Sequence, residues 1–190
     1  MSASNKKEQG RERILAAAGE VFAERGLDGA SLRAIAARAG YTPAALYFHF
    51  DSREAIYAEL LRASLANLAV AIVAAATGPN ALRAGALALF DFYAARPQEL
   101  ALGLYLGQGG PAPRGLGQKI DPALNALLLA ALGPIRAAAP QPEPDARVAE
   151  IFAQAVGLLV LAETRRLRLF GLAARGVMER MLDRMEDKSC

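Results

Sequence analysis

The sequence predicts an all-α protein, on two observations. Hydrophobic residues make up 54% of the 190 residues, and alanine and leucine, which favour helix, dominate among them. Alternating runs of β-branched and aromatic residues, which are typical of strands, are missing. A chain of this length and composition buries a substantial core. We expect about nine helices, in an N-terminal domain over residues 1–50 and a larger helical domain over residues 51–190.

The first element is predicted as an amphipathic helix from about Glu8 to Arg25. Gly26 follows this helix, and glycine readily adopts the left-handed conformation that ends a helix. Five apolar residues share one face of the helix at the spacing of a 3.6-residue period. They are Ile14, Ala17, Ala18, Val21 and Phe22. This face is expected to pack on the two helices that follow.

Residues 31–50 are predicted to form two short helices joined by a tight turn. Ser31 is a good N-cap for the first of them, and Gly40 supplies a left-handed residue at its end. Thr42 caps the second helix, and Pro43 stands at its first position, where a missing N–H costs nothing. Two helices this short bury little apolar surface alone, so they must lean on their neighbours.

The spacing of three residues identifies the pair as a helix-turn-helix. Ala36, Gly40 and Leu46 follow one another at intervals of four and then six residues. This places a small residue where the helices cross, a glycine at the turn and a core anchor on the second helix. The second helix is therefore expected to lie against DNA.

Six further helices are predicted in the rest of the chain. They are expected over about 51–77, 80–95, 97–106, 121–132, 145–170 and 173–185. Asp51 and Glu54 read as a capping box for the first of them, and Asp145 as the cap of the fifth. Residues 107–118 and 133–144 are rich in glycine or proline and are expected to be irregular.

Composition limits the classes of function. The net charge of +3 is too small to indicate nucleic acid by itself, so the placement of the basic residues has to carry that argument. The single cysteine is Cys190, so no internal disulfide is possible, which suits a reducing cytosol. The polar N-terminus does not read as a signal peptide. Residues 63–82 are uncharged but interrupted by polar residues, glycine and proline, so we expect a buried helix and no membrane span.

The sequence also disfavours an enzyme. It shows no Ser/His/Asp set, no metal cluster and no phosphate-cradling glycine loop followed by Gly-Lys. With His49 as the only histidine, we expect neither a metal site nor a cofactor.

With these elements in place, residues 9–61 resemble the TetR family of transcriptional regulators. The motifs that carry the resemblance are FAERG, SLRAIAARAG, LYFHF and DSRE, in that order. Beyond residue 61 the resemblance is architectural only. It implies a cytoplasmic homodimer that binds a palindromic operator on double-stranded DNA and that a small-molecule effector releases. Repression is the family's usual mode of regulation.

The resemblance and the chemistry of the side chains together predict the DNA-binding residues. They are Ser31, Arg33, Thr42, Pro43, Ala44, Ala45, Tyr47, His49 and Arg53. Ser31 at a helix N-terminus suits a phosphate, and the guanidinium of Arg33 suits a guanine edge. Tyr47 and His49 match positions that hold the DNA backbone in the family. Arg53 stands where the family usually has lysine and would contact another phosphate.

The start of the second helix differs from that of a protein that reads bases by hydrogen bonds. Pro43, Ala44 and Ala45 have no hydrogen-bonding side chains. They suit apolar contact with thymine methyl groups and close approach to the DNA. Specificity is therefore expected from Arg33, Thr42 and Tyr47, and from DNA shape.

Three of the predicted DNA-binding residues also have a purely structural interpretation. Tyr47 would then be a rim residue of the three-helix core, His49 a group at a helix end, and Arg33 a solvated surface charge. The cluster of Lys6, Lys7 and Arg11 is either a disordered tail or a DNA-binding arm.

The larger domain is expected to hold the dimer interface. Residues 151–162 are apolar most of the way round a helix, so both faces must be covered. The family resemblance implies that one face packs on a partner in a four-helix bundle, where Ala155, Gly157 and Ala162 allow close approach. The alternative is a buried core of a monomer.

The same domain is expected to hold a largely apolar effector between its helices. Polar residues within apolar stretches are the candidates for its pocket. They are Asp91, Tyr93, Tyr105, Gln108, Asn125, Glu163 and Thr164. Ligand binding would move the long helix that begins near Asp51 and weaken operator binding. The alternative function is a helical protein–protein interaction module that has lost specific DNA binding.

Overall fold

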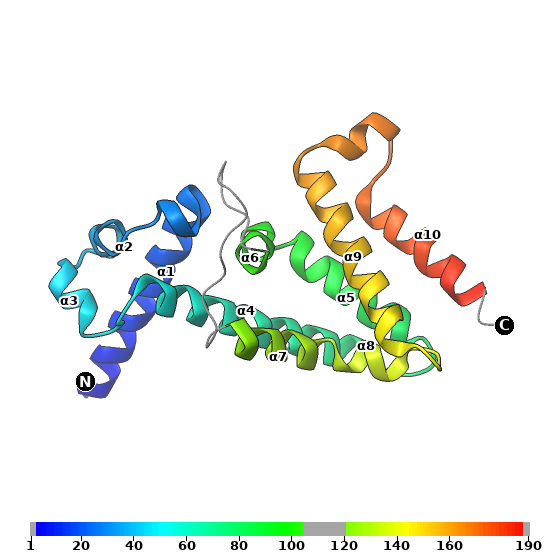
Figure 1. Ribbon diagram of the computed structural model, residues 1–190, viewed down its shortest axis with the longest axis horizontal. Coiled ribbons are helices and arrows are strands. Elements are labelled where there is room, and N and C mark those ends of the chain that lie inside the picture. Colours follow the sequence, from blue (N-terminus) through cyan, green and yellow to red (C-terminus); the bar gives the residue numbers. More distant parts are fainter. Residues whose placement is uncertain (1–2, 105–120, 188–190) are drawn as a thin grey trace. The chain divides into compact units, whose positions relative to one another are not determined.

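The computed structural model describes residues 3–104 and 121–187, and all of its regular structure is helical (Figure 1). The described residues form ten α-helices and one 3-10 helix. They are α1 (Ala3–Gly29), α2 (Leu32–Ala39), α3 (Pro43–Tyr47), α4 (Arg53–Ala75), α5 (Ala81–Ala94), α6 (Pro97–Gly103), α7 (Asp121–Ala131), α8 (Gly133–Ala138), α9 (Pro144–Glu163), η1 (Arg166–Phe170) and α10 (Ala174–Asp187). The all-α prediction is confirmed, with one helix more than expected. The predicted irregular segment 107–118 lies outside the described residues.

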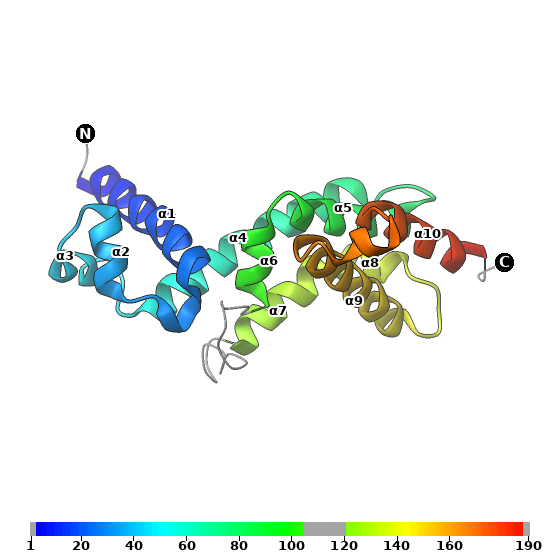
Figure 2. The same cartoon turned by 90° about the horizontal axis from the view of Figure 1, so that it is seen from above.

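The chain divides into two compact units. The first comprises Met1–Ser64 and Ala101–Asn125, and the second Leu65–Leu100 and Ala126–Cys190. The long helix α4 contributes residues to both units. Each unit is built from helices that cross one another (Figure 2).

In the first unit, α2 packs against α1 and against α3. The predicted apolar face of α1 is buried, and so are Ile35 and Ala36 of α2 and Leu46 of α3. The rings of Phe22 and Tyr57 meet edge to face with centroids 4.8 Å apart. This core holds α2 and α3 in a fixed arrangement although each helix is too short to be stable alone.

The predicted turn between α2 and α3 is present. Gly40 adopts a left-handed conformation with φ of 74°, and its backbone N–H donates to carbonyls of the last turn of α2. The next N–H, of Tyr41, donates to the carbonyl of Ala36 at 2.8 Å. Thr42 caps α3, and Pro43 stands in its first turn. The helix-turn-helix predicted over 31–50 is therefore observed.

In the second unit, α5 packs against α8, α9 and α10. The core of this unit includes Leu89 of α5, Ile135 of α8, Ile151 of α9 and Met178 of α10. Gly85 lets α5 and α8 approach closely, since a Cβ atom there would lie 3.0 Å from Cγ1 of Ile135.

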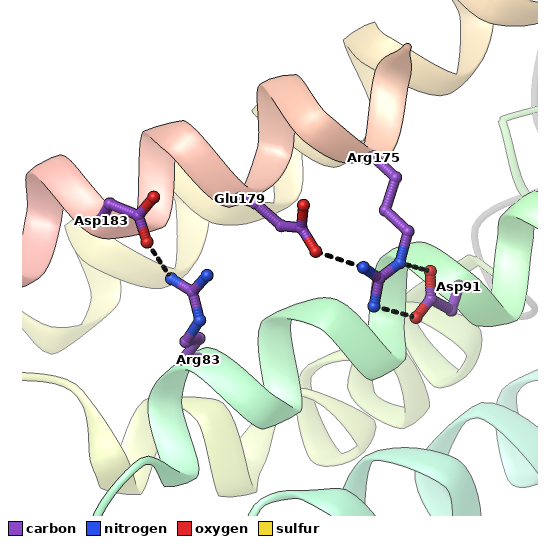
Figure 3. Close-up of polar contacts among 5 residues, drawn as sticks. All are labelled: Arg83, Asp91, Arg175, Glu179 and Asp183. Atoms are coloured by element: carbon purple, nitrogen blue, oxygen red, sulfur yellow. Dashed lines mark hydrogen bonds and ion pairs between the residues drawn. The ribbon is translucent and has the colours of Figure 1, made fainter.

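Ion pairs also join α5 to α10 across the surface of the second unit (Figure 3). Arg175 donates to both carboxylate oxygens of Asp91, at 2.9 and 3.1 Å, and pairs with Glu179 on its own helix. Arg83 donates to Asp183 at 2.5 Å. These side chains are partly exposed, so the pairs orient α10 more than they stabilise it.

The prediction that 133–144 is irregular was wrong for its first half, where α8 forms. Pro134 stands in the first turn of this helix, where its missing N–H costs no hydrogen bond. Ile135 is fully buried, and alanines complete the helix. Burial of Ile135 therefore stabilises a helix here, and Pro134 does not oppose it because it stands in the first turn.

Two helix ends also differ from the prediction. Helix α9 ends at Glu163 and not near Phe170, because Arg165 adopts a left-handed conformation with φ of 58° and η1 follows. Asp145 is not the cap of α9: it lies in the first turn and pairs with Arg136. The cap of α4 is Ser52 and not Asp51, since Oγ of Ser52 accepts from the N–H of Ala55 at 3.0 Å.

Among the described residues, α4 alone has the length and apolar character that a membrane span requires, with a mean hydropathy of 1.6 over its most apolar window. The core helix of a folded domain meets the same criteria. Ile56, Leu68 and Ile72 of α4 are fully buried within the protein.

Candidate nucleic-acid interface

The outward face of α3 is apolar and exposed. Leu46 is 0% exposed and anchors the helix in the core, whereas Tyr47 is 56% exposed and Phe48 is 83% exposed. Pro43 and Ala44 are also exposed. Phe48 was not among the predicted DNA-binding residues. Its position four residues after Ala44, on the side opposite Leu46, is the signal that could have found it.

Both capping hydroxyls of the helix-turn-helix lie at helix N-termini. Oγ of Ser31 accepts from the N–H of Ala34 at 3.1 Å, and Oγ1 of Thr42 accepts from the N–H of Ala45 at 3.2 Å. Accepting these bonds leaves each hydroxyl hydrogen available to donate. Each hydroxyl can therefore cap its helix and donate to a phosphate oxygen at the same time.

Arg33 is exposed in the first turn of α2. It lines an open hollow of about 610 Å³, together with Ser31, Arg25 and Arg38. Arg38 is held by two carboxylates of α1: it donates to Glu20 at 2.8 Å and to Glu24 at 2.9 and 3.0 Å. The hydrogen bond from Arg38 lowers the pKa of Glu24 below its ordinary value. Arg38 thus has a structural role, whereas Arg33 is exposed at the surface.

His49 packs inside the first unit more than it faces outward. Its ring lies edge to face with that of Tyr41, with centroids 6.0 Å apart, and borders Gly10 of α1. Nδ1 of His49 is buried without a hydrogen-bond partner in the described structure. The backbone of His49 makes polar contacts: its N–H donates to the carbonyl of Leu46 at 2.9 Å, and its carbonyl accepts from Arg11 at 2.9 Å.

Arg11 joins three elements of the first unit. Besides the carbonyl of His49 after α3, it binds Glu59 on α4, with Nε donating to Oε1 at 2.8 Å. Its guanidinium also lies 4.2 Å from the ring centroid of Phe50. Arg11 therefore positions the end of α3 against α4 and belongs neither to a tail nor to an arm. Lys6 and Lys7 fall within α1, which begins at Ala3.

Arg53 stands at the start of α4, where the backbone of Ala30 and the carboxylate of Glu54 are among the groups that it binds. Nη1 donates to the carbonyl of Ala30 at 3.1 Å, and Nε donates to Oε1 of Glu54 at 2.7 Å. Burial is the largest single effect on Glu54 and raises its pKa. The hydrogen bonds from Arg53, the Glu54 backbone and Ser52, together with the charge of Arg53, outweigh burial, so the pKa is lowered. These bonds tie the start of α4 to the residue before Ser31.

Five of the seven predicted effector residues lie within the described part of the chain. Tyr105 and Gln108 lie outside the described residues. Asn125, Glu163 and Thr164 are exposed, and the Thr164 hydroxyl donates to the carbonyl of Val160 at 2.8 Å.

The two remaining candidates lie on α5. Tyr93 is buried, and burial, together with the charge of Glu99, raises its pKa to about 12. Asp91 lines an open groove of about 590 Å³ beside α4. The other residues of this groove are Asn67, Val70, Ala71, Ala88, Phe92 and Arg96.

Within the described ranges, no three His, Cys, Asp or Glu side chains come close enough to hold a metal ion.

Comparison with known proteins places the DNA-binding motif in a known group. The family described as bacterial regulatory proteins, tetR family, matches residues 14–60. The repressor KstR2 of Rhodococcus jostii is 45% identical over 58 residues, which cover 30% of this chain and 28% of the relative. The activator FasR of Mycolicibacterium smegmatis is 38% identical over 90 residues, 45% of this chain and 41% of the relative. The chain thus aligns with less than half the length of each.

Solved structures share the fold along most of the chain. The crystal structure of SCO4313 has a TM-score of 0.78 at 24% identity and covers 96% of this chain and 98% of that one. FadR of Bacillus subtilis, in complex with stearoyl-CoA, has a TM-score of 0.70 at 16% identity, over 90% of this chain and 95% of that one. The architecture beyond the helix-turn-helix is therefore common to these proteins.

Proposed function

Because this chain belongs to the TetR family of transcriptional regulators, we propose that it is a ligand-responsive regulator whose residues 1–50 bind DNA and whose residues 51–190 bind an effector and dimerise. The observation that carries the proposal is the exposed outward face of α3, which the buried side chain of Leu46 anchors from behind. The relatives are named as transcriptional regulators, which confirms the prediction that the chain is not an enzyme.

The DNA-binding roles that we propose follow from where the side chains lie. Ser31 and Thr42 donate to phosphates, Arg33 binds a base edge, and Pro43, Ala44 and Ala45 approach the bases closely. Tyr47 is exposed and reaches the DNA backbone. His49 and Arg53 act through the structure as well, since one packs on Gly10 and the other binds the carbonyl of Ala30.

For the effector, we propose a small, largely apolar molecule. The groove between α4 and α5 supports this class, because Val70, Ala71, Ala88 and Phe92 offer apolar surface and Asp91 and Arg96 offer polar groups at its edge. Stearoyl-CoA, which is bound to FadR of Bacillus subtilis, has a long apolar chain. Binding beside α4 would move this helix, which begins next to the helix-turn-helix, and weaken operator binding. An effector that saturated the protein and left its operator affinity unchanged would contradict this part.

We further propose that the chain is a cytoplasmic homodimer, without a membrane span, that represses from a palindromic operator. Twofold symmetry requires the two recognition helices to contact half-sites about one DNA turn, or a multiple of it, apart. KstR2 is named a repressor and FasR an activator, so repression rests on the usual mode of the family.

Selection of bound duplexes from a random-sequence library, at physiological salt, tests the proposal. The wild-type chain is expected to enrich palindromic sites, and Arg33→Ala to lose affinity for them by about 5- to 150-fold, the range for one base-reading arginine. Arg147→Ala is the control, because Arg147 pairs with Glu150 on α9 in the second unit. Sequence-independent, salt-sensitive binding alone would contradict the proposal and favour the protein–protein interaction module.

A further inference from the structure

Phe48 extends the apolar face of α3 beyond the residues that the helix-turn-helix pattern identifies. At 83%, its exposed fraction is the highest among the exposed large hydrophobic residues of the described chain. An aromatic ring left in water at this position has surface to bury when a partner arrives.

Phe48 is the C-cap residue that follows α3, and its backbone continues the helical conformation. Its φ of −70° and ψ of −16° are helical, and its N–H donates to the carbonyl of Ala45 at 3.3 Å. Its side chain therefore follows that of Ala44 on the same helix face, one turn later. Pro43 and Tyr47 are a second pair with the same spacing. Ala44 and Phe48 lie opposite Leu46, and Pro43 and Tyr47 lie beside them on the exposed side.

The chemistry of this face selects its partner. The side chains of Pro43, Ala44 and Phe48 carry no hydrogen-bonding group, and Tyr47 adds one hydroxyl. In the major groove, hydrogen-bonding atoms mark every base, and the one apolar group is the 5-methyl of thymine. A face without donors or acceptors gains from methyl groups and leaves the polar base edges unpaired.

We propose that Ala44 and Phe48 form an apolar surface that reads the 5-methyl groups of thymine, so that the operator half-site requires thymine beneath this part of α3. The inference rests on the proposed function and specifies the DNA that the same face selects. Arg33 contacts a separate, polar position of the half-site from α2.

Replacement of thymine by uracil, as deoxyuridine in the duplex, tests the inference. The change removes the 5-methyl group and keeps the base pairing. The probe is a duplex that the full-length chain has selected from the random library, prepared with thymine or with deoxyuridine in both half-sites. The dissociation constant of the wild-type chain is expected to rise about fourfold for each methyl group buried, which corresponds to about 0.8 kcal/mol per buried carbon.

Phe48→Ala separates this role from a general effect of uracil on DNA. The variant is expected to bind the thymine duplex less tightly and to show a smaller ratio of the two dissociation constants than the wild type. Leu129→Ala changes another exposed side chain, on α7, and is expected to keep the wild-type ratio. Both positions are exposed, so neither variant should impair folding.

Four outcomes are decisive. A reduced ratio in Phe48→Ala supports the inference. Equal affinity of the wild type for the two duplexes, or an unchanged ratio in Phe48→Ala, overturns it and leaves the regulator function intact. Failure of the wild-type chain to select any duplex overturns the proposed function, and this inference with it.

Discussion

Two glycines of α1 have different surroundings, although both stand inside the same helix. A Cβ atom at Gly10 would lie 3.0 Å from the Tyr41 hydroxyl oxygen and 3.1 Å from Cε1 of His49. A Cβ atom at Gly19 would meet nothing within 4 Å. The absence of a side chain at Gly10 is therefore a packing requirement, set by the rings that close the helix-turn-helix against α1.

Gly10→Ala and Gly19→Ala should consequently change stability in opposite directions. Alanine at position 19 removes the helix penalty of glycine and is expected to stabilise by about 0.5–1 kcal/mol. Alanine at position 10 forces the rings of Tyr41 and His49 apart. The net effect, with the helix-propensity gain of alanine included, is expected to be a destabilisation of about 1 kcal/mol. Denaturant unfolding of the two variants measures this difference. Equal stabilisation by both would show that the rings move without cost.

At the scale of helices, the start of α4 depends on one hydroxyl. Ser52 accepts the N–H of Ala55, whereas the preceding residue, Asp51, is exposed. The position of this cap sets where α4 begins relative to Arg53, which binds the carbonyl of Ala30. A local hydrogen bond thus connects the helix-turn-helix to the long helix.

Ser52→Ala is expected to cost about 1 kcal/mol of stability, the usual loss when an N-cap serine is replaced. Asp51→Ala is the matched control, with an expected change within about 0.5 kcal/mol, as at ordinary surface positions. Thermal unfolding followed by circular dichroism compares them. A larger loss of stability for Asp51→Ala would show that Asp51 is the N-cap of α4, as the sequence predicted.

A second element-scale contact joins α8 to α9. The guanidinium of Arg136 holds the carboxylate of Asp145, with Nη2 donating to Oδ2 at 3.0 Å. This hydrogen bond lowers the pKa of Asp145 below its ordinary 3.8 and raises that of Arg136. Both side chains are exposed, so solvent weakens the pair.

The lowered pKa fixes the direction of a pH dependence. The contribution of the pair is fully present above the unfolded pKa of Asp145, and it is lost as the pH falls through the lower folded value. The melting temperature of the wild type is expected to exceed that of Asp145→Asn at pH 6, and the difference is expected to shrink below about pH 4. A difference that stayed constant from pH 6 to pH 2 would rule out this linkage.

For the whole molecule, the surface of α9 bears on the proposed homodimer. Ile151, Ala155 and Leu158 are buried in the protein's own core. Ala153, Gly157 and Leu161 repeat every four residues on an exposed face, where a Cβ atom added at Gly157 would meet nothing within 4 Å. Of the small residues expected at a dimer interface, Ala155 therefore packs inside the subunit, whereas Gly157 is free for close approach by a partner helix.

Gly157→Glu should disrupt such a dimer without unfolding the subunit, since glutamate favours helix more than glycine does. A charge on the face that two copies share would be desolvated and unpaired, so the variant is expected to be monomeric and to bind the palindromic operator more weakly. Leu129→Glu adds the same charge to an exposed site on α7 and is expected to remain a dimer like the wild type. Sedimentation velocity measures both. A dimeric Gly157→Glu would place the interface elsewhere.

The sequence by itself determined the helix-turn-helix, because its signals are local. The caps at Ser31 and Thr42 and the left-handed Gly40 act through hydrogen bonds to residues only a few positions away. The buried face of α1 follows from the 3.6-residue period alone, and the all-α class follows from composition.

Only the tertiary structure decided features that depend on distant partners. Burial of Ile135 against α5 makes α8 a helix in a proline-rich segment, and the left-handed Arg165 ends α9 early. Arg11 joins α1 to α4 because Glu59, 48 residues away, lies beside it. Whether a polar side chain in an apolar run is buried, as Tyr93 is, or exposed, as Thr164 is, also depends on what surrounds it in space. Short-range hydrogen bonds can be read along the chain, whereas burial and long-range pairing exist only once the helices have packed.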